Sequence, residues 1–151
     1  MSDVYMSLKF STDLKIRNPS STRPWQYVLD CLSSYYCLAK NLNKIKTGDA
    51  INFGPNGSNA FSVLDLVKEI KRYAPNLNYS VNTETEAFPE TNFLGLTNSL
   101  SKKTLGAQNK FDFAETIRVT VNWYLELLKG KEMRVISEKL IDDFLDLSGD
   151  V

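Results

Sequence analysis

The stretch Arg-Pro-Trp-Gln-Tyr-Val-Leu-Asp, from Arg23 to Asp30, constrains the fold most, because it joins an extended segment to the longest apolar helix pattern in the first half of the chain. Tryptophan favours burial, whereas a guanidinium group favours an anion. The stretch therefore has two interpretations. Either a buried Trp25 lies beside a solvated Arg23, or a loop presents Arg23 to an anionic ligand.

Short strand patterns alternate with amphipathic helix patterns along the rest of the chain. The spacing predicts strands over 14–17, 50–53 and 77–81, the end of a helix over 3–10, and helices over 28–46, 63–73, 98–105, 113–128 and 137–147. Ser62 and Asp65 form a capping pattern at the start of the helix over 63–73. The expected fold class is α/β, with few short strands and about five helices.

Length and composition exclude several classes of function. A chain of 151 residues can bury about 70% of its unfolded surface as one domain. The 18 basic and 18 acidic residues give no net charge to attract nucleic acid or an acidic membrane. No apolar run reaches the length of a membrane span and no secretion signal is present, which indicates a cytoplasmic protein. Histidine is absent and only two cysteines occur, so we expect no metal site.

Four sequence runs carry a family resemblance. They are Ile16-Arg17-Asn18-Pro19, Arg23-Pro24-Trp25-Gln26, Ala50-Ile51-Asn52-Phe53-Gly54-Pro55 and Asn122-Trp123-Tyr124. In this order and spacing they resemble the carboxyl-terminal half of the CDP-glucose 4,6-dehydratases, a branch of the NAD-dependent epimerase/dehydratase family of extended short-chain dehydrogenases/reductases. The resemblance runs from about Asp3 to about Leu147. It implies a single substrate-binding domain over 1–151, an incomplete Rossmann domain, and no dinucleotide-binding domain.

The resemblance also implies a substrate site. The matching arginine of the family contacts the diphosphate of a bound sugar nucleotide, which assigns that role to Arg23, and a planar fork of N–H donors suits phosphate oxygens. Trp25 would hold the loop, and Gln26 would reach either the ligand or its own backbone. Glu90 lies in the segment that closes over the nucleotide, where it either contributes to binding or is a solvated loop acid. Pro89 replaces the usual histidine of that segment.

Two other patterns imitate catalytic or cofactor motifs. Tyr36 and Lys40 have the Tyr-x-x-x-Lys spacing of the superfamily's catalytic pair, but the family's own pair lies in the absent half. Tyr36 also falls on the apolar stripe Leu29, Leu32, Tyr36, Ala39 and Leu42, so we expect core packing and no catalytic residue in this chain. Gly54 and Gly57 lack the three-glycine spacing of a dinucleotide fingerprint, and a tight turn explains them.

Two hypotheses follow for function. By resemblance, the complete enzyme is a lyase that uses NAD to oxidise C4 of the sugar, removes water across C5 and C6, and returns the hydride to C6. The chain would then be a fragment or split half that binds a CDP-glucose-like nucleotide sugar, without NAD of its own, and acts with a separate NAD-binding half or in a homo-oligomer. The alternative is a non-catalytic nucleotide-sugar-binding or protein-interaction module. That module would carry exposed apolar faces covered by another chain.

Overall fold

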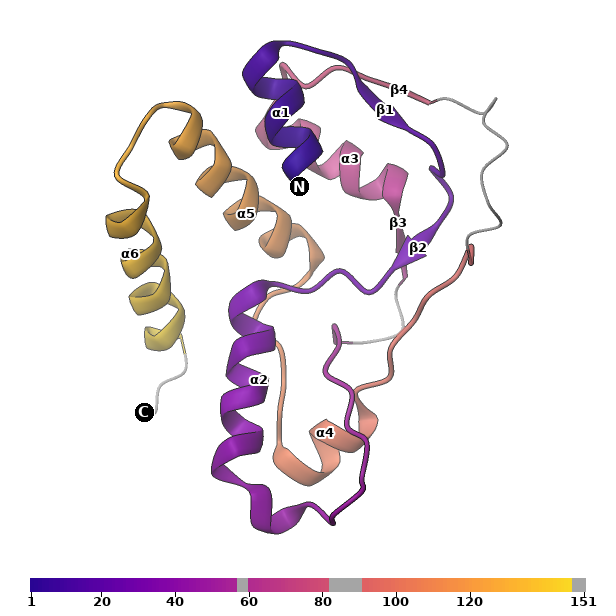
Figure 1. Ribbon diagram of the computed structural model, residues 1–151, viewed down its shortest axis with the longest axis vertical. Coiled ribbons are helices and arrows are strands. Elements are labelled where there is room, and N and C mark those ends of the chain that lie inside the picture. The colour runs from indigo at the N-terminus through magenta and orange to yellow at the C-terminus, as the bar shows by residue number, and fades with distance from the viewer. Residues whose placement is uncertain (57–59, 82–90, 148–151) are drawn as a thin grey trace.

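The computed structural model describes residues 1–56, 60–81 and 91–147. Within them lie the helices α1 (Ser2–Phe10), α2 (Val28–Lys40), α3 (Val63–Tyr73), α4 (Ser99–Leu105), α5 (Phe113–Leu128) and α6 (Met133–Asp146), a 3₁₀ turn (Leu42–Lys44), and the strands β1 (Leu14–Ile16), β2 (Thr22–Arg23), β3 (Phe61–Ser62) and β4 (Tyr79–Val81). The predicted α/β class with few short strands is confirmed (Figure 1).

The strands form two small sheets. Strand β1 pairs in parallel with β4, with Leu14 opposite Tyr79, and β2 pairs antiparallel with β3, with Arg23 opposite Phe61. An isolated bridge joins Thr22 to Phe93. Because each described strand has only two or three residues, the helices supply most of the core.

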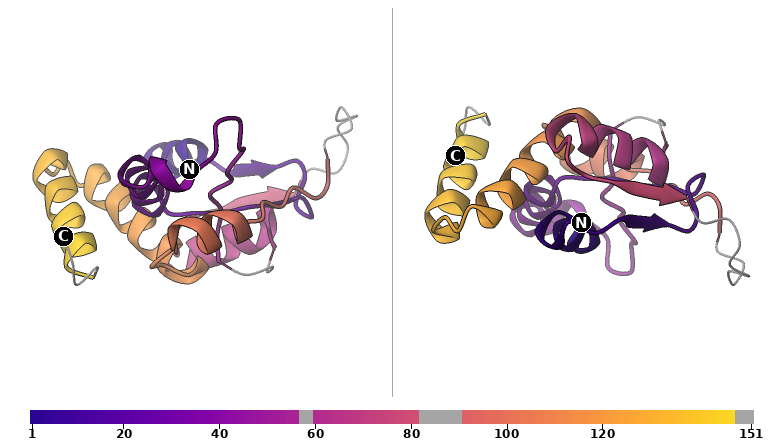
Figure 2. Two further views of the ribbon diagram at one scale, coloured as in Figure 1. Left: turned by 90° about the horizontal axis from the view of Figure 1, so that it is seen from below. Right: turned by 90° about the horizontal axis from the view of Figure 1, so that it is seen from above.

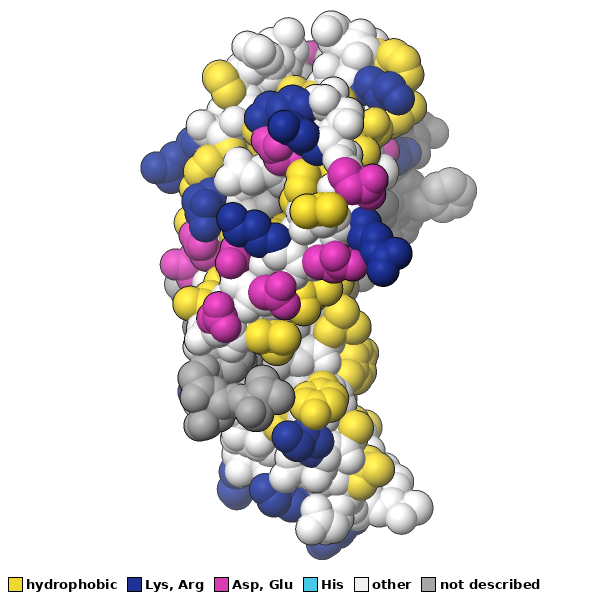
Figure 3. Space-filling view, turned by 90° about the vertical axis from the view of Figure 1, so that its left-hand side faces the viewer, with side chains coloured by type: hydrophobic (Ala, Val, Ile, Leu, Met, Phe, Trp, Pro, Cys, Tyr) yellow, Lys and Arg dark blue, Asp and Glu magenta, His cyan; other side chains and the backbone are white. Residues whose placement is uncertain are grey.

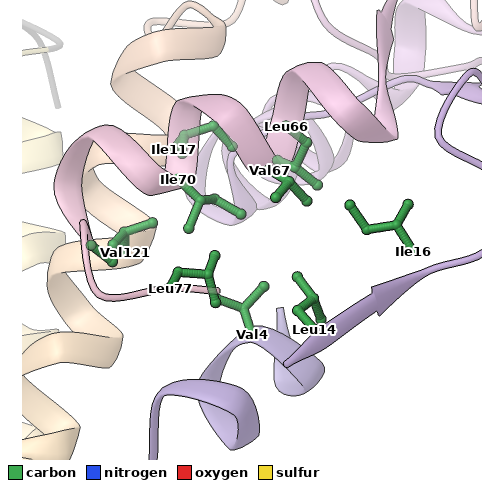
Figure 4. Close-up of a cluster of buried hydrophobic side chains, with 10 residues drawn as sticks. Val4, Leu14, Ile16, Leu66, Val67, Ile70, Leu77, Ile117 and Val121 are labelled. Atoms are coloured by element: carbon green, nitrogen blue, oxygen red, sulfur yellow. The ribbon is translucent and has the colours of Figure 1, made fainter. Parts of the chain in front are cut away.

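The main core lies around α3. Its residues Leu66, Val67 and Ile70 are buried and face α1, β1 and α5 (Figure 4). The partners that complete the buried cluster are Val4, Leu14, Ile16, Ala74, Leu77, Ile117 and Val121. The helix spacing over 63–73 and over 113–128 predicted this contact surface correctly, because both helices bury one apolar stripe.

Local signals fix the ends of two helices where the sequence predicted them. The Ser62 side chain accepts a hydrogen bond from the backbone N–H of Asp65, and the Asp65 carboxylate accepts one from the backbone N–H of Ser62. This reciprocal pair is a capping box. Helix α4 ends at Gly106, which has a φ of 69°, a conformation that glycine adopts without strain.

A second, smaller cluster holds α6. Tyr27, Val119 and Phe144 are buried together, and they join the start of α2 to α5 and α6. Figure 2 shows α6 at one end of the molecule, with α5 between it and the layer of α1 and α3. None of the helices in the described ranges is long and apolar enough to cross a membrane.

Several predicted bounds were wrong. The helix predicted over 28–46 ends at Lys40, and a separate 3₁₀ turn follows it. Residues 50–53 form no strand, because no segment in the described part of the chain pairs with them and a strand needs a hydrogen-bonded neighbour. The last helix begins at Met133 instead of Ser137, and of its expected apolar face only Phe144 is fully buried. Ile141 and Leu145 are exposed.

The orientation of α2 is the largest departure from the predicted structure. Its buried residues are Asp30 and Ser34, whereas Leu32 and Tyr36 are 54% and 60% exposed. The prediction that Tyr36 packs in the core is therefore wrong. The physical reason is that Asp30 has buried hydrogen-bond partners, which turn the helix so that its polar side faces inward.

Candidate functional site

Arg23 lies at the junction of β2 with the segment 91–93. Its Nη1 donates hydrogen bonds to the carbonyl oxygens of Thr22, at 2.8 Å, and of Thr91, at 3.2 Å. The backbone N–H of Thr22 also donates to the Asn92 carbonyl, at 2.9 Å. The side chain of Arg23 is half-buried, and it lines neither of the two pockets described below. The guanidinium group is thus held against two chain segments that are far apart in sequence.

Trp25 fixes the loop that follows β2. Its indole Nε1 donates a hydrogen bond of 2.9 Å to the Phe61 carbonyl, and its ring packs partly buried against the main core. The hydrogen bond shows how Trp25 is held, and its place in the substrate site stays a prediction. The contact also ties β2 to the residue that begins β3.

Gln26 has a partner that sequence reasoning did not foresee. Its Nε2 donates to Oδ1 of Asn109 at 3.0 Å, and a contact of Gln26 with a ligand stays a prediction. Asn56 then donates from Nδ2 to the Asn109 carbonyl at 2.7 Å. The three polar side chains connect the Arg-Pro-Trp-Gln and Asn-Phe-Gly-Pro runs to the segment before α5.

Glu90 and Pro89 lie outside the described residues. Thr97, further along the same segment, is described, and its Oγ1 lies 2.9 Å from Oγ of Ser99 at the start of α4. Gly54 packs closely on the same segment, since a Cβ at that position would lie 3.0 Å from Cβ of Leu96. Close packing therefore explains Gly54, where a tight turn was expected, and Gly57 lies outside the described residues.

Asp30 is a buried acid that the sequence reading did not single out. Its Oδ1 accepts from the backbone N–H of Lys110 at 2.7 Å, and its Oδ2 accepts from that of Phe111 at 3.3 Å. Burial raises the pKa of Asp30, and these hydrogen bonds oppose the rise. The sequence does carry a signal for the buried acid, because Asp30 is a single carboxylate inside the apolar run 27–32. A carboxylate buried in such a run needs hydrogen-bonded or charged partners.

Two pockets lie on either side of Trp25 and the segment around it. The first, of about 480 Å³, is lined mainly by apolar side chains from the start of α2, from α5 and from α6. The second, of about 1150 Å³, lies at the amino-terminal ends of α3 and α5 and mixes charged residues with the stacked rings of Phe61 and Phe113. Trp25 lines both pockets.

Tyr36 and Lys40 form a surface contact, with the Lys40 ammonium nitrogen 5.2 Å from the centre of the Tyr36 ring. Cys31 and Cys37 are free thiols. Among the residues that the structure describes, no group of three or more histidine, cysteine, aspartate or glutamate side chains is placed to hold a metal ion.

No family model matches the chain. Over 146 residues the chain is 30% identical to CDP-glucose 4,6-dehydratase of Salmonella typhimurium, in a match that covers 95% of this chain and 40% of that protein. The resemblance based on the four sequence runs is therefore confirmed.

The solved structures agree with this match. A dTDP-glucose 4,6-dehydratase from Bacillus anthracis in complex with NAD superposes with a TM-score of 0.65 and 18% identity, over 82% of this chain and 38% of that one. The chain has the fold of the carboxyl-terminal part of an extended short-chain dehydrogenase/reductase.

A second extended short-chain dehydrogenase/reductase gives the same result. It is a UDP-glucose 4-epimerase from Stenotrophomonas maltophila with bound NAD and formylated UDP-arabinopyranose, with a TM-score of 0.70 and 14% identity, over 85% of this chain and 40% of that one. The chain thus spans about two fifths of the length of the relatives it matches.

Proposed function

We propose that this chain forms the nucleotide-sugar-binding part of a CDP-glucose 4,6-dehydratase-like lyase and does not carry out the reaction by itself. The observation that supports this most is the sequence match, because it extends over 95% of the chain and includes the Arg-Pro-Trp-Gln run. The substrate is a nucleotide sugar with a diphosphate, and CDP-glucose is the first compound to test.

Arg23 is the proposed contact to the diphosphate. Two hydrogen bonds from Nη1 to carbonyl oxygens, of Thr22 and Thr91, fix the plane of the guanidinium group. A fixed plane favours a bidentate contact with phosphate oxygens, because little side-chain freedom remains to be lost on binding. Trp25 and Gln26 stabilise the loop that carries Arg23 through their hydrogen bonds to Phe61 and Asn109. They act on the ligand by holding this loop. Glu90 remains a proposed contributor from the segment that precedes Thr91.

The second pocket, at the amino-terminal ends of α3 and α5, does not fit NAD. A dinucleotide site needs open backbone N–H donors at a helix amino terminus. Here Asp65 closes the amino terminus of α3 with a carboxylate, and the side chain of Asp112 caps α5 by accepting from the N–H of Glu115. We therefore assign NAD and the redox step to polypeptide outside these 151 residues, as part of the complete enzyme.

Calorimetric titration of CDP-glucose into the 151-residue chain tests the proposal. Arg23→Ala should weaken binding by about 1.5–3 kcal/mol, which is about 10- to 150-fold. Arg23→Lys should lose most of the same affinity, because it keeps the charge and not the planar fork. Arg134→Ala is the matched control, since Arg134 lies in α6 and pairs with Glu138.

Circular dichroism should show that all three variants keep the fold. Unchanged affinity in Arg23→Ala, or an equal loss in Arg134→Ala, would contradict the diphosphate assignment.

The exposed apolar side of α2 favours a second candidate, a binding or interaction module without catalysis. The neighbouring reading frames distinguish the two. A frame that encodes a Gly-x-x-Gly-x-x-Gly start and its own Tyr-x-x-x-Lys supports the split enzyme. The absence of such a frame beside a complete reading frame for this chain supports the module.

A further inference from the structure

Helix α6 is attached to the chain outside the main core. Every residue of that core that the structure describes lies between Val4 and Leu125, before α6 begins. Within α6, Phe144 is buried, whereas Ile141 and Leu145 are exposed. Figure 3 looks onto the side of the molecule where α6 lies in Figure 1, and it shows charged side chains gathered there. A helix that buries little apolar surface can open separately from the rest of a fold.

Lys110 holds the carboxyl-terminal end of α6. Its ammonium group donates a hydrogen bond of 2.6 Å to the Phe144 carbonyl, in the last turn of the helix, and lies 3.9 Å from the centre of the Phe144 ring. Carbonyl groups in the last turn of a helix lack intrahelical partners, and a cation there meets the negative end of the helix dipole. The contact therefore combines a charge-assisted hydrogen bond with a cation–π interaction.

The backbone of Lys110 is anchored to α2. Its N–H donates to the carboxylate of Asp30 at 2.7 Å, and the neighbouring N–H of Phe111 donates to the same carboxylate at 3.3 Å. Asp30 is 1% exposed, so these bonds lie in the interior. The side chain of Lys110 thus reaches from a fixed backbone position to a helix of which little is buried.

The other end of α6 follows a short turn. Helix α5 ends at Leu128 and α6 begins at Met133, and within the turn Gly130 has a φ of 72°, which glycine adopts without strain. Short segments at the ends of elements can absorb the changes in φ and ψ that move a helix. Near this turn, the indole Nε1 of Trp123 donates to Oγ of Ser137 at 3.0 Å. Helix α6 can therefore turn about its amino-terminal end once its carboxyl-terminal end is released.

Helix α6 forms one wall of the apolar pocket of about 480 Å³. Ser137, Leu140 and Ile141 line this pocket together with residues of α5 and the start of α2. We propose that α6 is a hinged helix that closes the pocket, and that Lys110 is the latch that holds it closed. The proposal does not rest on the proposed function, because Arg23 does not line this pocket.

Hydrogen–deuterium exchange of the 151-residue chain, measured by mass spectrometry, tests the latch. In the natural chain, residues 137–146 should exchange at least about tenfold faster than residues 63–73 of α3. Lys110→Met should raise exchange of 137–146 by at least about another tenfold, since a hydrogen bond from a charged donor is worth roughly that factor, and leave 63–73 within about twofold. Lys139→Met, which replaces an exposed lysine of the same helix, is the matched control and should change neither region.

Fluorescence of 8-anilinonaphthalene-1-sulfonate, which binds exposed apolar surface, reports whether the pocket opens. Its signal should rise at least about threefold in Lys110→Met and stay unchanged in Lys139→Met. Equal exchange of 137–146 in Lys110→Met and in the natural chain would overturn the latch. Equal acceleration of 63–73 and 137–146 would overturn the hinge, because α6 would then open only when the whole chain unfolds. Faster exchange of α6 without a rise in fluorescence would overturn the closure of the pocket.

Discussion

At the scale of single residues, Trp25, Gln26 and Asp30 each bond to a partner that is distant in sequence. The partners of Trp25 and Gln26, Phe61 and Asn109, lie 36 and 83 residues away. Asp30 has the same kind of partner. Its burial depends on two N–H groups that the segment before α5 brings to α2.

Replacement of Asp30 should therefore destabilise the fold. Asp30→Ala leaves the backbone N–H groups of Lys110 and Phe111 without their acceptor in a buried place. The expected loss is about 2–4 kcal/mol of unfolding free energy, measured by urea denaturation. Asp142→Ala, an exposed acid on α6, is the control and should change stability by less than about 0.5 kcal/mol. A loss for Asp30→Ala no larger than that of the control would contradict the assigned role.

The raised pKa of Asp30 also predicts a pH dependence. Burial raises its pKa above the ordinary value of 3.8, so the folded chain holds this proton more tightly than the unfolded chain. The stability that the protonated Asp30 adds is fully present below the ordinary pKa of 3.8. It is lost as pH rises through the higher pKa that Asp30 has in the folded chain. The stability difference between the natural chain and Asp30→Asn should therefore fall as pH rises from about 3.5 to about 7, in urea titrations at several pH values. A difference that grows with pH would show that the pKa is lowered instead.

At the scale of elements, prediction succeeded where one stripe decides the contact. Helix α3 begins at its capping box and buries Leu66, Val67 and Ile70, as its spacing indicates. Prediction failed for α2, because its apolar stripe is real but faces outward. Periodicity identifies two sides of a helix and does not say which one meets the core when buried polar contacts compete.

The capping box gives a prediction for α3. Ser62→Ala removes the acceptor for the Asp65 N–H and should cost about 1 kcal/mol of unfolding free energy. Ser33→Ala on the exposed surface of α2 is the matched control, and it should be neutral or slightly stabilising because alanine favours a helix. A smaller loss for Ser62→Ala than for Ser33→Ala would exclude the cap as a contributor to stability.

The reversed orientation of α2 gives a second element-level prediction. Ile70→Ala should cost about 2–5 kcal/mol, because Ile70 is fully buried between helices. Leu32→Ala should change the stability of the 151-residue chain by less than about 0.5 kcal/mol, because Leu32 is exposed. Both values come from chemical denaturation. A large loss for Leu32→Ala would show that the predicted core stripe was right and the orientation of α2 wrong.

At the scale of the whole molecule, the α/β class and the family resemblance could be read from the sequence, because the four runs keep their order and spacing over the chain. The pairing of β2 with β3 could not, since strands of two residues carry no periodicity. The proposed function makes this chain one part of a larger fold, and that proposal would also account for the outward apolar side of α2.

The most direct test of the central claim is an NMR titration of CDP-glucose into the isotopically labelled chain. The account predicts that the backbone amide signals of Thr22 and Arg23, the indole N–H of Trp25 and the amides of 91–93 shift with increasing ligand, while those of α6 do not. Shifts confined to the α5 and α6 residues that line the apolar pocket of about 480 Å³, or no shift at any concentration of CDP-glucose, would contradict the claim that Arg23 marks a nucleotide-sugar site.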